Sequence, residues 1–153
     1  MRLLATIFLF AVLGATPALA FGNLFGGSFE NVSPANGVVT LDASGLEKGQ
    51  SQHYRLKENG KTIRFFVVRD NQGTLRVALD ACDVCWREDK GYINKDGGMV
   101  CVNCGQKFAY NRIGQVHGGC NPHPVAFTVA ENTVTIQAQV LLDGAGYFPG
   151  NAR

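Results

Sequence analysis

The sequence has little that points to nucleic acid or to an anionic membrane as a partner. Its 14 lysines and arginines nearly balance its 12 aspartates and glutamates, so the formal net charge is only +2. A chain without a strong positive field attracts phosphate groups only weakly. Beyond residue 20, no stretch reaches the roughly 18 apolar residues that a membrane-spanning helix needs. We therefore expect no nucleic-acid partner, and no membrane span after residue 20.

The sequence also lacks an internal repeat and the apolar spacing of a helix of ordinary length. It has short alternating apolar segments separated by turn residues, and these indicate strands. We therefore predict a mainly β fold, an antiparallel domain that carries an inserted hairpin with a metal or cluster site. A small β-rich α+β domain is the alternative. The expected strands cover residues 38–41, 52–57, 63–68, 74–79, 125–129 and 134–142. Residues 63–68 are apolar on both faces, which indicates a central strand that is covered on both sides.

The first twenty residues have the features of a secretory signal peptide. Arg2 gives a positive start, residues 3–13 are almost entirely apolar, and Ala18-Leu19-Ala20 fits the small-residue cleavage pattern. We expect cleavage after Ala20 and export of the chain. An uncleaved N-terminal anchor is the alternative.

Composition divides the rest of the chain into three parts. Residues 21–36 are rich in glycine, asparagine, serine and proline and are expected to form an irregular arm. Residues 37–143 are expected to form one β-rich domain, with a cysteine site at 82–120. Residues 144–153 carry glycine and proline breaks and are expected to form a loose tail.

Two Cys-x-x-Cys pairs are the strongest chemical signal in the chain. The pairs are Cys82 with Cys85 and Cys101 with Cys104, separated by fifteen residues, a spacing typical of four-thiolate metal sites. Asp96-Gly97 lies between them and predicts a tight hairpin turn, as Asn59-Gly60 does earlier in the chain. A hairpin at Asp96-Gly97 would fold Cys101 back beside Cys85. Four thiolates that meet in this way suit Zn²⁺ or an iron–sulfur cluster.

Other readings of these cysteines remain open. Exported cysteines normally form disulfides, although five cysteines cannot all pair within one chain. A thioredoxin-like redox motif would need a helix start in a βαβ unit, which the sequence does not indicate. Spacing alone favours a closed structural zinc site over an iron–sulfur cluster.

The fifth cysteine, Cys120, follows two glycines and precedes Pro122. Glycine permits close backbone approach, so this loop is suited to holding a thiol in a fixed position. Cys120 is either a further ligand or a small buried apolar residue, which is the common fate of a free cysteine. His117 and His123 flank it and are possible metal ligands or proton carriers.

Several segments together resemble one bacterial family, the FtrD-like iron–sulfur proteins, over about residues 50–125. The resemblance is carried by an ordered set of motifs and is more specific than the two Cys-x-x-Cys pairs alone. These motifs are Arg64–Asp70, Ala78–Cys85, Gly91-Tyr92, Met99–Gly105, Phe108, Ile113-Gly114 and Gly118–Pro122.

The resemblance implies a periplasmic protein with a [4Fe–4S] or [2Fe–2S] cluster and a role in ferrous-iron uptake. It implies Cys82, Cys85, Cys101 and Cys104 as cluster ligands, with Cys120 in the same motif set. The implied partners are a periplasmic redox or iron-transport protein and an iron permease system. We expect an electron carrier rather than a catalyst. Familiar members carry several membrane spans ahead of the domain, whereas this sequence indicates only a signal segment.

Two alternatives from other functional classes are carried forward. The first is a structural Zn(Cys)₄ ribbon that stabilises a docking surface. The second is a thiol-based redox or metal-handling protein with reversible thiols and no stoichiometric cofactor.

Overall fold

The structure is a computed structural model that describes residues 28–151. The expected signal peptide and its cleavage site after Ala20 lie outside the described residues. So do the first part of the expected arm, residues 21–27, and residues 152–153. Among the described residues, no helix is long and apolar enough to cross a membrane.

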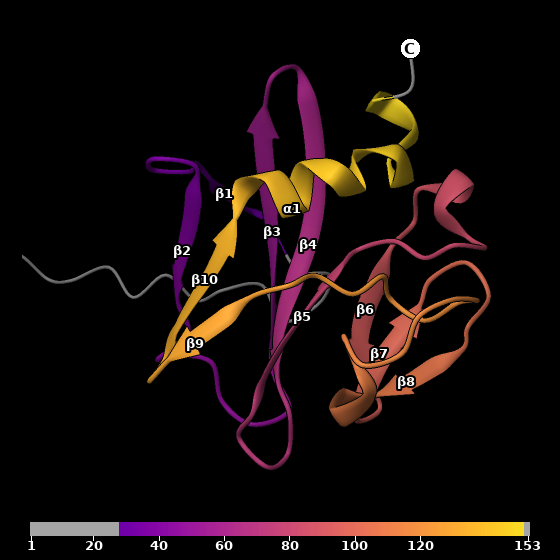
Figure 1. The fold of residues 1–153 in the computed structure, drawn as a ribbon. Coiled ribbons are helices and arrows are strands. Elements are labelled where there is room, and N and C mark those ends of the chain that lie inside the picture. The colour runs from indigo at the N-terminus through magenta and orange to yellow at the C-terminus, as the bar shows by residue number, and fades with distance from the viewer. Residues whose placement is uncertain (1–27, 152–153) are drawn as a thin grey trace, which may run out of the picture.

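Three small sheets make up most of the fold, with the largest between the other two (Figure 1). The first has the order β1-β3-β4-β5, with β1 (Glu30–Val32), β3 (Ser51–Glu58), β4 (Lys61–Arg69) and β5 (Leu75–Leu79). The second has the order β2-β10-β9, with β2 (Val38–Asp42), β10 (Thr133–Gln137) and β9 (Thr128–Ala130). The third has the order β6-β7-β8, with β6 (Tyr92–Lys95), β7 (Gly98–Cys101) and β8 (Lys107–Ala109).

The predicted fold class is confirmed, since strands dominate and nearly all of them pair antiparallel. Both predicted hairpins form. Asn59 and Gly60 have φ of 52° and 73° and join β3 to β4, and Asp96 and Gly97 have φ of 53° and 77° and join β6 to β7. Asparagine, aspartate and glycine are the residues that adopt positive φ most readily.

Strand β4 divides the interior into two cores, as its two apolar faces predict. Phe65 and Val67 face a large core shared with the second sheet. Phe66 and Val68 face a smaller core shared with the third sheet and with Cys82. Successive strand residues point to opposite sides. Strand β4 therefore packs against the second sheet through one face and against the cysteine region through the other; Figure 1 shows the first sheet between these two parts.

The C-terminal part differs from the prediction. The strand expected over 134–142 ends at Gln137, and a short helix, α1 (Ala138–Asp143), follows it. Ala138 and Leu141 are its buried residues. Three-residue spacing puts them on one helical face, so the apolar pattern there fits a helix turn as well as a strand.

The expected loose tail is also ordered within the described residues. Two 3₁₀ helices, η3 (Gly144–Tyr147) and η4 (Pro149–Asn151), continue from α1. Phe148 is buried in the large core. The Asn151 side chain accepts from the backbone N–H of Thr62 at 2.8 Å and donates to its carbonyl at 2.7 Å. These contacts with β4 fix a segment whose glycines and proline suggested disorder.

The N-terminal arm is not wholly irregular either. Its described part contains β1, which pairs parallel with β3, with Glu30 opposite Tyr54. The sequence did not predict this strand for two reasons. Its pairing depends on a partner more than twenty residues away, and a strand of three residues is too short to show an alternation of apolar and polar residues.

Candidate metal centre

Three separate segments carry the five cysteines. Cys82 and Cys85 lie in the loop between β5 and the short 3₁₀ helix η1 (Trp86–Glu88). Cys101 is the last residue of β7, and Cys104 lies in the turn that follows. Cys120 comes from the loop before β9. The sequence predicts that the first two segments meet through the β6–β7 hairpin, and the structure brings the third to the same place.

The sulfur atoms form two overlapping triads that share Cys85. In one triad the Sγ atoms of Cys82, Cys85 and Cys101 all lie within 4.8 Å of one another. In the other the same holds for Cys85, Cys104 and Cys120. The Cys85 and Cys120 sulfurs are 3.8 Å apart, and all five thiols are free. Cys120 is therefore part of the thiol cluster and not an isolated buried residue.

Burial changes across the cluster. Cys82 and Cys101 are fully buried, Cys85 and Cys120 are partly buried, and Cys104 is exposed. The buried side packs in the smaller core, which includes Phe66. One side of the cluster is therefore shielded from water and the other reaches the surface.

Backbone amides point at some of the sulfurs. The Cys85 N–H donates to the Cys82 Sγ at 3.2 Å. A hydrogen bond from the backbone N–H of Gln106 is the main cause of the lowered pKa of the Cys104 thiol. Such bonds favour the thiolate form and tune a bound metal.

Burial acts in the opposite direction on two other thiols. It raises the pKa of Cys101 and of Cys120 to about 12 in each case. Buried thiols without a nearby positive charge stay protonated, and a metal ion reverses this by displacing the protons. A cluster of five thiols with this burial is therefore suited to binding a metal cation.

The separation of the sulfurs also fits a thiolate-bound metal. Tetrahedral zinc with Zn–S bonds of about 2.3 Å places its sulfurs roughly 3.8 Å apart, which is the Cys85–Cys120 separation of 3.8 Å. Iron coordinated by thiolates is also found in such soft-ligand sites. The donor set thus suits iron–sulfur or zinc chemistry.

A buried polar network lies next to the cysteine cluster, and it was not predicted from the sequence. Asp80 lies two residues before Cys82 and is almost fully buried, and its Oδ1 accepts from the Tyr92 N–H at 2.7 Å. Burial raises the pKa of Asp80 to about 7. Arg64 Nε lies 3.7 Å from Asp80 Oδ2, and His53 Nε2 lies 3.9 Å from Asp80 Oδ1. The only signal in the sequence was a single aspartate at the end of an apolar strand.

The two candidate histidines lie near each other, and neither belongs to a triad. The His117 and His123 rings are 6.2 Å apart. The ring centroids of His123 and Tyr147 are 4.5 Å apart, and His123 Nδ1 lies 3.6 Å from Asp83 Oδ1. Over residues 28–151, the groups of potential metal-ligand atoms contain only cysteines.

Searches among curated proteins and among solved structures find no match to the chain. A family described as "Membrane iron-sulfur containing protein FtrD-like" does match, over residues 46–148. This span covers all five cysteines, the three strands β3 to β5 and the whole third sheet. The match covers well over half of the chain, and its name agrees with the thiol cluster. The chain therefore belongs to the FtrD-like family of iron–sulfur proteins.

Proposed function

We propose that this chain is an exported, periplasmic one-electron carrier with a cysteine-ligated iron–sulfur centre. The observation that carries the proposal is the pair of overlapping sulfur triads, buried at Cys82 and Cys101 and exposed at Cys104. A cluster bound there supplies reversible one-electron oxidation and reduction. The ligands would come from Cys82, Cys85, Cys101, Cys104 and Cys120.

The protein's own residues set the surroundings of that centre. Phe66, Tyr92 and Phe108 pack in the smaller core beside the buried cysteines, and they exclude water from that side. The Cys85 amide donates to the Cys82 sulfur. Water exclusion and hydrogen bonds to sulfur are the main means by which a protein adjusts a cluster's reduction potential.

The exposed side is suited to brief contact with a redox partner. Val84 and Val102 are 63% and 43% exposed, and each sits inside one of the Cys-x-x-Cys loops. Exposed valines beside an exposed Cys104 give a small apolar face at the point where electrons would enter or leave. Electron-transfer partners typically meet over small interfaces of this kind.

Membership of the family supports a link to iron uptake. In that role the chain accepts one electron when a ferrous ion is oxidised to the ferric state, and passes it to a one-electron acceptor. The partners would be a periplasmic redox or iron-transport protein and an iron permease system.

Voltammetry of the anaerobically purified protein tests the electron-carrier role. We expect one reversible one-electron wave, and an electron paramagnetic resonance signal in only one of the two redox states. A protein that contains iron but shows no reversible wave between about −700 and +450 mV, the range of known clusters, would contradict the proposal.

A structural Zn(Cys)₄ site is the second candidate, and the 3.8 Å separation of the Cys85 and Cys120 sulfurs favours it. Four thiolates around one zinc ion form a closed site that contributes to folding. This candidate predicts one zinc ion per chain, no visible absorption and no redox wave.

A further inference from the structure

Two histidines and an aspartate lie together beside the cysteine cluster and share none of its thiols. Asp83 comes from the first Cys-x-x-Cys loop, and His117 and His123 lie on either side of Cys120. The Asp83 Oδ1 and His123 Nδ1 atoms are 3.6 Å apart, and the ring centroids of the two histidines are 6.2 Å apart. Two imidazoles and one carboxylate are a donor set that proteins use for non-haem Fe²⁺.

These separations suit two ligands on one ion. With metal–ligand bonds of about 2.1 Å, the ligand atoms of two residues on a shared ion lie roughly 3–4 Å apart, and two imidazole rings have centres about 4.5–6.5 Å apart. The distance between Asp83 and His123 and the distance between the two rings both fall within these ranges.

His117 is the residue that must turn to complete the group. The three residues do not bring their ligand atoms within 4.8 Å of one another, although Asp83 and His123 do so as a pair. His117 is exposed, and Gly118 follows it with a φ of 87°. Exposed side chains change rotamer within nanoseconds, so His117 can close on an ion that the other two residues already hold.

Asp83 and His123 are held in place by their surroundings. The Tyr147 hydroxyl donates to Asp83 Oδ1 at 2.6 Å, and the Tyr147 ring lies against the His123 ring. The His123 backbone is bonded to Leu79 and to Ala81, at 2.8 and 2.9 Å. A carboxylate can accept several hydrogen bonds or metal bonds, and a hydrogen bond that orients it is a regular part of a metal site. Tyr147 therefore has the features of a positioning residue.

The surroundings favour a cation that is reached from solvent. A pocket of about 450 Å³ is lined by both histidines, by Asp143, and otherwise by apolar residues and glycines. None of the described residues that line it is a lysine or an arginine. The side chains of His123 and Asp83 are 31% and 42% exposed, so water can fill the remaining coordination positions of an ion.

We propose that Asp83, His117 and His123 bind one exchangeable divalent transition-metal ion, with ferrous iron as its natural occupant. The binding does not rest on the proposed function. Asp83 directly follows Cys82 in the chain, so the ion lies next to the cysteine centre. Its role as electron donor does rest on the proposed function: Fe²⁺ loses one electron to become Fe³⁺, and the centre gains that electron.

Mn²⁺ is the first probe, because it favours oxygen and nitrogen ligands over thiolates. The protein is purified without oxygen, with its cysteine site loaded, and is kept reduced so that no electron moves during the titration. Electron paramagnetic resonance measures the Mn²⁺ that remains free. We expect saturation at one bound Mn²⁺ per chain and release of that ion by Fe²⁺, which binds such sites more tightly. Excess Mg²⁺ should not release it, because Mg²⁺ selects oxygen ligands.

Four variants locate the binding. His117→Gln and His123→Gln each remove one imidazole, and Asp83→Asn removes the negative charge. Each of these three should weaken Mn²⁺ binding at least tenfold, since even the loss of a group that only orients a ligand costs about ten- to a hundredfold. Tyr147→Phe keeps the ring and removes the hydrogen bond to Asp83, and it should weaken binding about tenfold.

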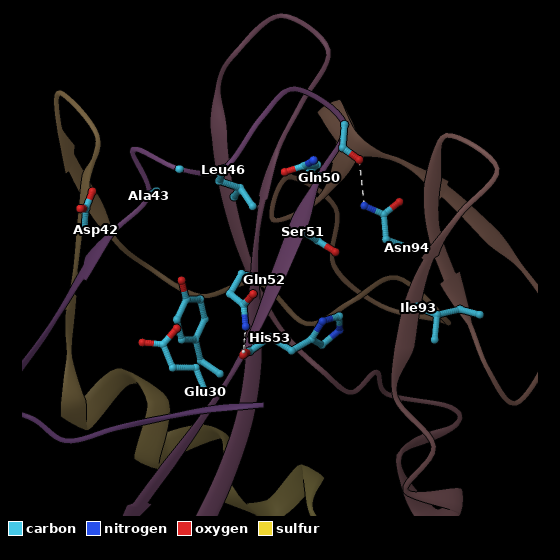
Figure 2. Close-up of a pocket in the computed structure, with 13 residues that line it drawn as sticks. Glu30, Asp42, Ala43, Leu46, Gln50, Ser51, Gln52, His53, Ile93 and Asn94 are labelled. Atoms are coloured by element: carbon cyan, nitrogen blue, oxygen red, sulfur yellow. Dashed lines mark hydrogen bonds between the residues drawn. The ribbon is translucent and has the colours of Figure 1, made fainter. Parts of the chain in front are cut away.

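Two variants serve as controls. His53 is the third histidine of the chain, and it lies on β3 beside a different pocket, with Gln52 and Asn94 (Figure 2). Asp96 lies in the β6–β7 turn, at a positive φ that asparagine also adopts. His53→Gln and Asp96→Asn should therefore bind Mn²⁺ as the wild type does.

The proposal would be overturned if the wild type bound no Mn²⁺ or if excess Mg²⁺ released it. It would equally be overturned if Asp83→Asn and His123→Gln kept the wild-type affinity, or if the two controls lost as much as they do. Voltammetry separates this result from the proposed function. A reversible wave without Mn²⁺ binding would overturn the ion site alone, and Mn²⁺ binding without a wave would leave the site in place and remove only its role as electron donor.

Discussion

The Tyr92 hydroxyl donates a 2.7 Å hydrogen bond to the carbonyl oxygen of Cys120, a residue 28 positions away in the sequence. The Tyr92 ring is buried in the smaller core, with Phe66 and Phe108 at 6.0 and 6.1 Å. Its backbone N–H bonds to Asp80. One residue of β6 therefore ties the loop of the fifth cysteine to the segment that leads into Cys82.

Replacing Tyr92 by phenylalanine should free the Cys120 loop. The ring and its packing remain, but the hydrogen bond is lost, which should cost about 1–2 kcal/mol of the free energy of unfolding. In metal-free protein, we expect alkylation of the Cys120 thiol to become several times faster, as measured by peptide mass spectrometry.

Tyr110→Phe is the matched control for this change. Tyr110 is also a buried tyrosine whose hydroxyl is bonded, in this case to Asn94 Oδ1 at 2.6 Å, away from the cysteine loops. Equal rates of Cys120 alkylation in the two variants would show that the Tyr92 hydrogen bond does not restrain that loop.

A charge at Val102 should slow electron exchange between copies of the protein. Val102→Glu places like charges on the exposed apolar face beside the centre, and like charges that meet repel. We expect a lower self-exchange rate, measured by NMR line broadening in mixtures of oxidised and reduced protein, with an unchanged visible spectrum. Val129→Glu is the control, because Val129 is equally exposed, at 44% against 43%, but lies on β9 of the second sheet. The same slowing in both variants would contradict the proposed docking face.

Gly91→Ala should destabilise the protein more than Gly60→Ala does. Both glycines have positive φ, +66° and +73°, so the two substitutions share the backbone strain of placing a side chain there. A Cβ at Gly91 would overlap the Asp80 carboxylate, whereas nothing lies within 4 Å of a Cβ at Gly60. Overpacking of this kind costs about 1–3 kcal/mol. Chemical denaturation measures the difference, and equal losses would mean that the Asp80 contact is easily relieved.

The stability of the protein should depend on pH through His53. Burial lowers the pKa of His53 from 6.5 to about 4. Between these values the unfolded chain binds more protons than the folded chain, so stability is lost as the pH falls. Lowering the pH from 6.5 to 5 should therefore cost about 2 kcal/mol through this residue.

Burial raises the pKa of Asp80 to about 7. The stabilisation that this carboxyl contributes is therefore lost as the pH rises, which is opposite to the effect of His53. Comparison of the wild type with His53→Gln isolates the histidine, since Asp80 is present in both. Parallel pH profiles for the two proteins, or a His53 ring signal that titrates near pH 6.5 by NMR, would refute this account.

The central strand of the fold and its two hairpins could be predicted from the sequence. The two apolar faces of β4 identified it as a central strand, and Asn59-Gly60 and Asp96-Gly97 identified the turns. The pattern was not sufficient at the C-terminus, because Ala138, Val140 and Leu142 continue the alternation of a strand. The structure instead buries Ala138 and Leu141, which share one face of a helix.

The same contrast holds for the site. The meeting of Cys85 with Cys101 followed from a local hairpin and could be predicted. The approach of Cys120 depends on the Tyr92 hydroxyl and on backbone hydrogen bonds that join His123 to Leu79 and Ala81. The buried position of Asp80 depends on the packing of two sheets. Contacts of this kind are made between distant segments by individual side chains, and no local periodicity encodes them.

Metal content with a visible spectrum, on protein purified without oxygen, tests the central claim most directly. The account predicts iron with acid-labile sulfide and a visible band that dithionite bleaches. It also predicts a large loss of both in Cys85→Ser, because the Cys85 sulfur belongs to both triads. A colourless protein with one zinc ion per chain, or full iron and colour retained in Cys85→Ser, would contradict it.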